Sequence, residues 1–197
     1  SPGGGLHVTV IWRPTETGTL ARQSIALSAP ILRLAFAPAV LDVVRTRAAF
    51  DALEDEWNAL FERAGRDTQV FQTFNWNWHW ANHYLPADEH TSPSPQLAIV
   101  IARRNGRLVM VWPLVQERVA GLRVLRWMGE PVSQYGDVLI DTLADADGLL
   151  DRAWELIATQ LRPDVIHLRK VRADAVVAPL LRAAGALQVA SAAAPYL

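Results

Sequence analysis

The sequence contains no cysteine, and this absence excludes several kinds of site at once. Without thiols a chain can form no disulfide scaffold, no thiolate zinc site and no cysteine nucleophile. Lysine is nearly as scarce, because Lys170 is the only one among the 19 basic residues. A formal net charge of −1 leaves no general excess of positive charge to neutralise phosphates, so we do not expect a nucleic-acid partner.

The sequence also has no hydrophobic run long enough to cross a membrane. Its most apolar stretch, residues 24–44, contains two prolines and is interrupted by Arg33 and Asp42, whereas a membrane helix needs about 20 consecutive apolar residues. We therefore expect no transmembrane segment. The same stretch lacks the features of a secretory signal, so the cytoplasm is the default location.

What is present is the composition of an ordinary globular domain. The chain has 197 residues, of which 51% are hydrophobic and 20% charged, and this length is enough to bury a sizeable core without a metal or disulfide. Residues 1–38 differ from the rest, because glycines and prolines surround short apolar segments there. We interpret residues 1–38 as a flexible or partly ordered tail, with one strand expected at residues 32–36, and residues 39–197 as the domain.

Hydrophobic periodicity predicts two helices early in the domain, after a short strand. Apolar residues recur at helical spacing over residues 50–64, with Thr46 placed to cap the start of the helix and Gly65 to end it. Thr73 is placed to cap a second helix, which is rich in tryptophan and ends before Pro86.

Four apolar runs then predict an antiparallel meander: residues 97–102, 108–114, 122–128 and 138–140. Asn105 and Gly106 between the first two runs favour the positive φ angles of a type I′ turn, which makes this hairpin the clearest local prediction.

The last third of the chain alternates between helix and strand. Helices are predicted over residues 149–161 and 176–184, and strands over residues 165–168 and 187–190. The whole order predicts an α/β fold in which a mixed, largely antiparallel sheet carries helices on both faces.

Five short motifs follow one another along the domain. They are EWNAL at 56–60, VFQTFNW at 70–76, VWPL at 111–114, YGDVL at 135–139 and HLRKV at 167–171. With the predicted order of elements, these motifs resemble the first half of FemAB-like proteins of the GNAT acetyltransferase family. The most similar group is the CelD-type protein associated with bacterial cellulose biosynthesis. The resemblance covers residues 41–197 and implies a GNAT-like fold.

The resemblance implies a protein with two GNAT-like halves, of which the second binds acyl-CoA. A GNAT domain usually holds the CoA pyrophosphate at an Arg/Gln-x-x-Gly-x-Gly/Ala sequence at the start of a helix. Residues 141–148 stand in that place, and they contain three aspartates and one glycine. Because carboxylates repel a diphosphate, we expect this half to bind no cofactor, with Asp145 or Asp147 capping the next helix instead. A second partial match at residues 182–186 is predicted to be a helix end.

The function implied is acyl transfer from acyl-CoA to an amine or hydroxyl acceptor in cellulose or cell-surface polysaccharide biosynthesis. In this interpretation the chain lines the acceptor cleft, has no activity alone and has the C-terminal GNAT half as its partner. The resemblance leaves open whether the chain is a fragment or a complete single-domain acetyltransferase with an unusual donor site.

The candidate site residues lie in the YGD motif and on the tryptophan-rich helix. Asp137 and Tyr135 are the candidate catalytic residues, with Asp137 as general base toward the acceptor. Gln134, Trp76 and Trp80 are the candidate substrate-binding residues, since indole rings can stack on sugar rings. The same residues also have a structural interpretation, as a loop that hydrogen-bonds to itself and as aromatic side chains of the core.

A second class of function remains open, a non-enzymatic module that binds a glycan or a protein partner through its aromatic cluster. Burial of Trp76, Trp78 and Trp80 together would exclude this alternative. His79 and His83 have the spacing of two metal ligands on a helix, but without an evident third ligand we predict no metal site.

Overall fold

The structure, a computed structural model, describes residues 6–12, 38–86, 95–141 and 146–193. The strands are β1 (Leu6–Trp12), β2 (Val40–Val44), β3 (Gln96–Leu97), β4 (Ile99–Arg104), β5 (Arg107–Trp112), β6 (Leu114–Val119), β7 (Leu122–Trp127), β8 (Leu139–Ile140), β9 (Val165–Arg172) and β10 (Leu187–Ala193). The helices are α1 (Arg47–Asp51), α2 (Glu54–Ala64), the 3₁₀ helix η1 (Asp67–Gln72), α3 (Phe74–Tyr84), α4 (Ala146–Leu156), the π-helix η2 (Ile157–Leu161) and α5 (Ala178–Ala183).

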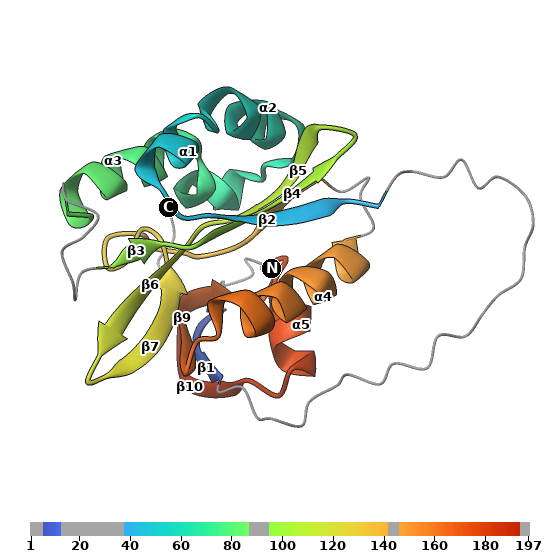
Figure 1. The fold of residues 1–197 in the computed structure, drawn as a ribbon. Helices are drawn as coiled ribbons and strands as arrows, with labels where there is room; N and C mark the ends of the chain where they lie inside the picture. The colour runs from blue at the N-terminus through green and yellow to red at the C-terminus, as the bar shows by residue number, and fades with distance from the viewer. Residues whose placement is uncertain (1–5, 13–37, 87–94, 142–145, 194–197) are drawn as a thin grey trace, which may run out of the picture.

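The strands form two largely antiparallel sheets that lie between two groups of helices. One sheet has the order β10-β1-β9-β7-β6-β3, and the other has the order β2-β4-β5-β8. Figure 1 shows α1, α2 and α3 on one side of the sheets, and α4 and α5 on the other. The prediction of a mixed α/β fold, largely antiparallel and with helices on both faces, is confirmed.

Two tight turns set the hairpins of these sheets. Asn105 and Gly106 have φ angles of 52° and 77°, as a type I′ turn requires, and they join β4 to β5 as predicted. Ala120 and Gly121 have φ angles of 50° and 83° and join β6 to β7. In both turns the positive φ angle of the second residue explains why glycine stands there.

The two sheets are connected by strands that bend. Pro113 separates β5 from β6, and Ala98 separates β3 from β4 on the neighbouring strand. The backbone N–H of Ala98 donates to the carbonyl of Leu114 at 3.0 Å, so the strands stay paired across the bend. Since proline has no N–H to give to a ladder, it marks the point where the hairpin passes from one sheet to the other.

This bend overturns one prediction, the four-stranded meander. The last run of the meander, β8, does not lie beside β7 but pairs with β5, where Met110 is opposite Ile140 and Val111 is opposite Leu139. After Pro113 the chain enters the six-stranded sheet, where β6 pairs with β7. The free edge of β5 in the four-stranded sheet therefore pairs with β8. The four paired side chains are all buried.

The helix ends follow the predicted capping residues. Thr46 accepts a hydrogen bond from the N–H of Ala49 at 3.3 Å, and Thr73 accepts one from the N–H of Trp76 at 3.4 Å. The helix predicted over residues 50–64 is divided into α1 and α2 by a short turn at residues 52–53, and it ends at Gly65 as predicted.

The predicted alternation of the last third is confirmed by α4, β9, α5 and β10. Gly185 follows α5 with a φ angle of 70°, so the sequence around it is the end of a helix, as predicted.

Two strands were not predicted from the sequence, β6 (Leu114–Val119) and β1. Strand β1 lies between β9 and β10 and pairs with both in antiparallel fashion. The strand expected at residues 32–36 lies outside the described residues.

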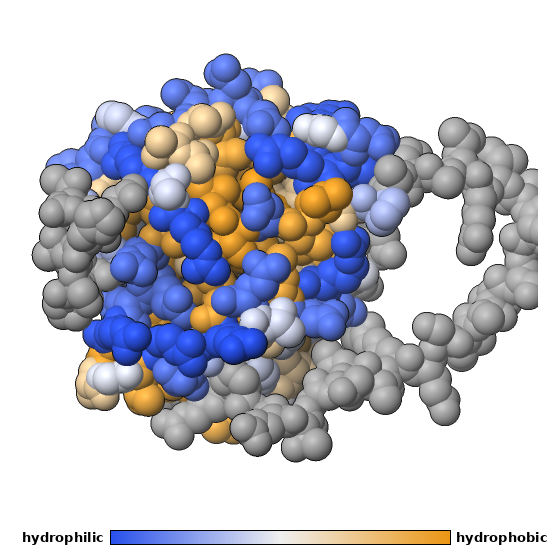
Figure 2. Space-filling view, viewed as in Figure 1, coloured by the Kyte–Doolittle hydropathy of each residue, from blue (hydrophilic) through white to orange (hydrophobic). Residues whose placement is uncertain are grey.

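Two hydrophobic clusters fill the space between the sheets and the two groups of helices. The cluster beneath α4 and α5 contains Trp112, Trp127 and Trp154. The cluster beneath α1–α3 contains Phe50 and Trp57, whose rings contact each other with centroids 6.0 Å apart. Figure 2 shows hydrophobic residues at the surface between the two helix groups, over the edge strand β2.

Candidate functional site

The YGD motif lies in the segment between β7 and β8, at the place where two parallel strands separate. β7 and β9 are paired only where Val124 and Leu125 face Val165 and Ile166. Farther along β9, Gly136 takes the place of β7, forming a parallel bridge with Val171. Residues 133–138 therefore occupy the space between the two strands.

Gly136 fits between these strands because it has no side chain. A Cβ atom added at this position would lie 2.4 Å from the indole ring of Trp127 on β7. On its other side, the N–H of Gly136 donates to the carbonyl of Lys170 on β9 at 3.3 Å. The close approach requires glycine for steric reasons, and it leaves no room between the segment and β7.

Asp137 is buried, and both of its carboxylate oxygens accept hydrogen bonds. Its four donors are the side-chain amide of Gln69 at 2.9 Å and the backbone N–H groups of Val138 at 2.8 Å, Val176 at 3.1 Å and Val177 at 3.2 Å. Burial raises the pKa of the Asp137 carboxyl, and the hydrogen bonds from these groups oppose the shift. In this position Asp137 joins η1, β8 and the turn that leads into α5.

The two residues before Gly136 are held by neighbours from other elements. Tyr135 is buried, its ring contacts Phe71, and the guanidinium of Arg172 lies 5.1 Å from its centroid. The side-chain amide of Gln72 donates to the carbonyl of Tyr135 at 3.1 Å. Gln134 is half-buried, and its side-chain oxygen has no hydrogen-bond partner among the described residues.

The candidate tryptophans of α3 are tied to the same segment. The indole N–H of Trp76 donates to the hydroxyl of Ser133 at 2.9 Å, and that of Trp80 donates to the carbonyl of Glu130 at 2.8 Å. Trp80 is buried, whereas Trp76 and Trp78 are half-buried. The three tryptophans are therefore not buried together, and two of them keep surface that a ligand could contact.

Buried polar side chains connect these parts, and Asp137 is the one among them that the sequence had indicated as a candidate. Among the described residues, the buried polar side chains are those of Gln69, Gln72, Asn77, Ser133 and Asp137. Gln72 and Asn77 each donate to a backbone carbonyl, while their side-chain oxygens have no partner in the described part of the chain. Glutamine and asparagine inside the VFQTFNW motif and α3 were the available signal, since a buried amide needs hydrogen-bond partners.

The acidic segment after β8 is described only in part. Asp141 accepts a hydrogen bond from Arg63 at 3.3 Å between Oδ2 and Nε. Asp145, one of the predicted caps, lies outside the described residues, while Asp147 lies within α4.

The described residues contain no group of three or more histidine, aspartate or glutamate side chains arranged to hold a metal ion. His79 and His83 are exposed, and Nδ1 of His83 lies 2.8 Å from the carbonyl oxygen of His79. In the part of the chain that the structure describes, no helix is both long and apolar enough to pass through a membrane.

A scan of the sequence against protein-family models finds no match, and a search of curated proteins finds no relative.

Proposed function

We propose that this chain is the first GNAT-like half of a FemAB-like, CelD-type acyltransferase. In this proposal the chain forms the acceptor side of the active-site cleft, and a second GNAT-like half binds acyl-CoA. Support comes from the order of the five motifs and from the mixed α/β arrangement, in which two of the motifs lie against each other through Gln72 and Tyr135.

The observation that carries the proposal is the position of residues 133–138. Resemblance to GNAT proteins implies that substrates enter where the sheet separates. In this chain β7 and β9 are the strands that separate, and Gly136 is bonded to β9 and packed against Trp127 in the space between them. A donor with a long pantetheine arm would have to displace this segment, which is anchored by the four hydrogen bonds of Asp137.

The acceptor is proposed to bind beside this segment, on its α3 side. The exposed part of Trp76 offers a face for a sugar ring. Gln134 is half-buried in the same segment and is proposed to form a hydrogen bond with a hydroxyl or ammonium group of the acceptor. Asp137 and Tyr135 then act by holding Gln134 in place, because both are buried and Asp137 is fully hydrogen-bonded.

The proposed reaction is direct transfer. The lone pair of an acceptor amine or hydroxyl attacks the thioester carbonyl, the carbon–sulfur bond breaks, and the proton lost by the acceptor goes to the departing thiolate. The product is an amide or an ester, and the context implied by the resemblance is cellulose or another cell-surface polysaccharide.

A non-enzymatic glycan-binding or partner-binding module is the second candidate. The observation that favours it is the surface left on Trp76 and Trp78, together with Tyr84, which stacks on Trp80 and is 43% exposed.

Thermal denaturation tests the proposal. A ligand that binds only the native state stabilises it by RT ln(1 + L/Kd), where L is the free ligand concentration, so at a fixed concentration a tighter ligand raises the melting temperature more. We expect micromolar acetyl-CoA to leave the melting temperature of the 197-residue chain unchanged, and to raise that of a protein that joins this chain to the proposed second half, which should also transfer the acetyl group to an amine or sugar. Stabilisation of the 197-residue chain would overturn the proposal, and cello-oligosaccharide binding without acyl transfer by the joined protein would favour the second candidate.

A further inference from the structure

β7 and β9 carry charged side chains on the face of their sheet that points away from the hydrophobic cluster beneath α4 and α5. Along β9, Ile166 and Leu168 are buried in the cluster beneath α4 and α5. Because side chains alternate along a strand, His167 and Arg169 lie on the opposite face. Arg126 of β7 belongs to this face too, since its neighbours Leu125 and Trp127 point into the same buried cluster.

Most charged groups on this face already have partners. Nη1 of Arg126 forms an ion pair with Glu117 of β6 at 2.6 Å. The ammonium of Lys170 donates to the carbonyls of Pro131 at 3.2 Å and Ser133 at 2.8 Å. Glu130 is turned toward the backbone, where its carboxylate accepts from the N–H of Arg169 at 3.4 Å.

Two groups remain available. The side chain of Arg169 is exposed, and no hydrogen bond or ion pair of its guanidinium is found among the described residues. Its nearest opposite charge is the Glu130 carboxylate: burial raises the pKa of Glu130, and the charges of Arg169, Arg126 and Lys170 oppose that shift. The ring of His167 is half-buried and likewise has no hydrogen-bond partner in the described part of the chain. Burial is the main cause that lowers the pKa of His167, and the positive charges of Arg126 and Arg169 lower it further, which places the ring near both arginines.

We infer that this face binds an oxyanion, a carboxylate or a phosphate, with the guanidinium of Arg169 as the principal donor and the ring of His167 as the second. A guanidinium presents two parallel N–H groups that match the two oxygens of either anion. Arg126 adds positive charge without a direct contact, because Glu117 occupies its Nη1.

The site lies next to the proposed acceptor region. Glu130 lies between the two, because its carboxylate accepts from the N–H of Arg169 and its backbone carbonyl accepts the indole hydrogen bond of Trp80 on α3. We therefore infer that the anion is part of the acceptor, which would be a uronic acid or a phosphorylated sugar. This identification of the anion rests on the proposed function, whereas the inference that the face binds an anion does not depend on it.

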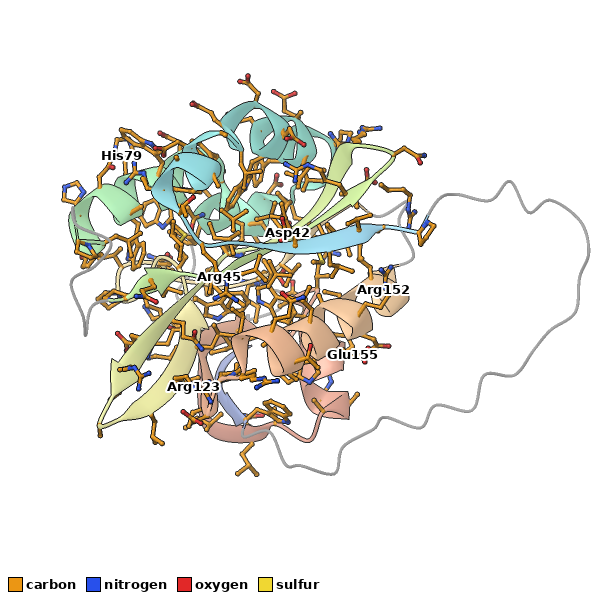
Figure 3. The ribbon with its side chains drawn as sticks, viewed as in Figure 1. Asp42, Arg45, His79, Arg123, Arg152 and Glu155 are labelled. Carbon is orange, nitrogen blue, oxygen red and sulfur yellow. The ribbon has the colours of Figure 1, made fainter. Side chains whose placement is uncertain are left out.

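The matched control is Arg107, an exposed arginine at the turn between β4 and β5. Arg123, labelled in Figure 3, is a poorer control, because it is paired with Asp164 at 3.3 Å. Replacing Arg169 by Gln removes the proposed donor, whereas replacing Arg107 by Gln changes the net charge equally without touching the site. An Arg169→Lys variant keeps the charge but loses the bidentate geometry.

The experiment titrates inorganic phosphate and glucuronate, separately and at constant ionic strength, into the 197-residue chain while NMR follows the ring signals of His167. A His167→Gln variant assigns those signals. We expect saturable shifts with a dissociation constant of roughly 1 mM, as for one charge-assisted contact at a surface. Arg169→Gln should weaken binding by about tenfold or more, Arg169→Lys by less, and Arg107→Gln should leave it unchanged.

The two arms identify the source of the anion. A response to phosphate alone indicates a phosphorylated acceptor, and a response to glucuronate alone indicates a uronate. Absence of saturation with both anions, or equal losses in the Arg169 and Arg107 variants, would overturn the inference. If the wild-type chain and Arg169→Gln both bind acetyl-CoA tightly, the proposed function is wrong. The anion site is tested separately, by the titrations with phosphate and glucuronate.

Discussion

The side-chain amide of Gln69 donates a 2.9 Å hydrogen bond to the carboxylate of Asp137, 68 residues away in sequence. Gln69 lies on η1, directly before the VFQTFNW motif, and Asp137 is the last residue of the YGD motif. The contact fixes the segment between β7 and β9 to the helical layer above the sheet.

Asp137→Ala should destabilise the fold by about 3 kcal/mol, because it leaves buried backbone N–H groups of Val176 and Val177 without an acceptor. Urea unfolding measures the loss. The control is Asp55→Asn on the exposed face of α2, where we expect a change below about 0.5 kcal/mol. Equal effects of the two substitutions would mean that Asp137 does not anchor the segment.

Gly136→Ala tests the close packing between the segment and β7. The new methyl group would meet the indole ring of Trp127, so we expect a loss of about 1–3 kcal/mol and altered tryptophan fluorescence. Gly106→Asn in the turn between β4 and β5 is the comparison: nothing lies within 4 Å of its position, so any loss there comes only from its positive φ, which asparagine adopts more readily than most residues, and it should be smaller than the loss at Gly136. Unchanged stability of Gly136→Ala would show that residues 133–138 do not fill the space between β7 and β9.

The indole hydrogen bond of Trp80 should be measurable by itself. Trp80→Phe keeps most of the buried ring but loses the bond to the Glu130 carbonyl, and we expect a cost of about 1–2 kcal/mol in chemical denaturation. Trp78→Phe on the same helix is the matched comparison, since Trp78 is only half-buried. If the two variants lose the same stability, the hydrogen bond from Trp80 to the Glu130 carbonyl does not contribute measurably to the free energy of unfolding.

His167 should make stability depend on pH. Its pKa lies below the ordinary 6.5 because of burial and the charges of Arg126 and Arg169, so the unfolded chain binds a proton more readily than the folded one. This contribution is complete above pH 6.5 and is lost as pH falls through the lowered pKa. His167→Gln should reduce the slope of unfolding free energy against pH in that window, and an unchanged slope would contradict the assignment.

The sequence predicted the features that short-range chemistry determines. Thr46, Thr73 and the Asn105-Gly106 turn act through groups one to three residues away, so their roles follow from local sequence. Strand β8 was misplaced because its partner depends on the bend at Pro113, which decides the sheet to which each part of the long hairpin belongs. Strand β1 was missed although its β-branched residues were a signal, since its position depends on pairing with β9 and β10.

The sequence indicated which residues form the candidate site, but it did not indicate how their side chains are bonded. The resemblance led to Asp137 and Tyr135, but a motif does not reveal that Asp137 has four donors around it. Hydrophobic patterns place Gln69 and Asn77 at the surface, whereas partners elsewhere in the chain allow both to be buried. Arg169 was noted in sequence only as part of the HLRKV motif, because an arginine without a partner can be recognised only when its neighbours are known.

Calorimetric titration of the 197-residue chain with acetyl-CoA tests the central claim most directly. The segment at residues 133–138 occupies the space between β7 and β9, so the account predicts no saturable heat at micromolar concentrations. Saturable binding of one equivalent with a dissociation constant of about 100 µM or tighter, within the usual range of enzyme substrates and unchanged in Arg169→Gln, would contradict it.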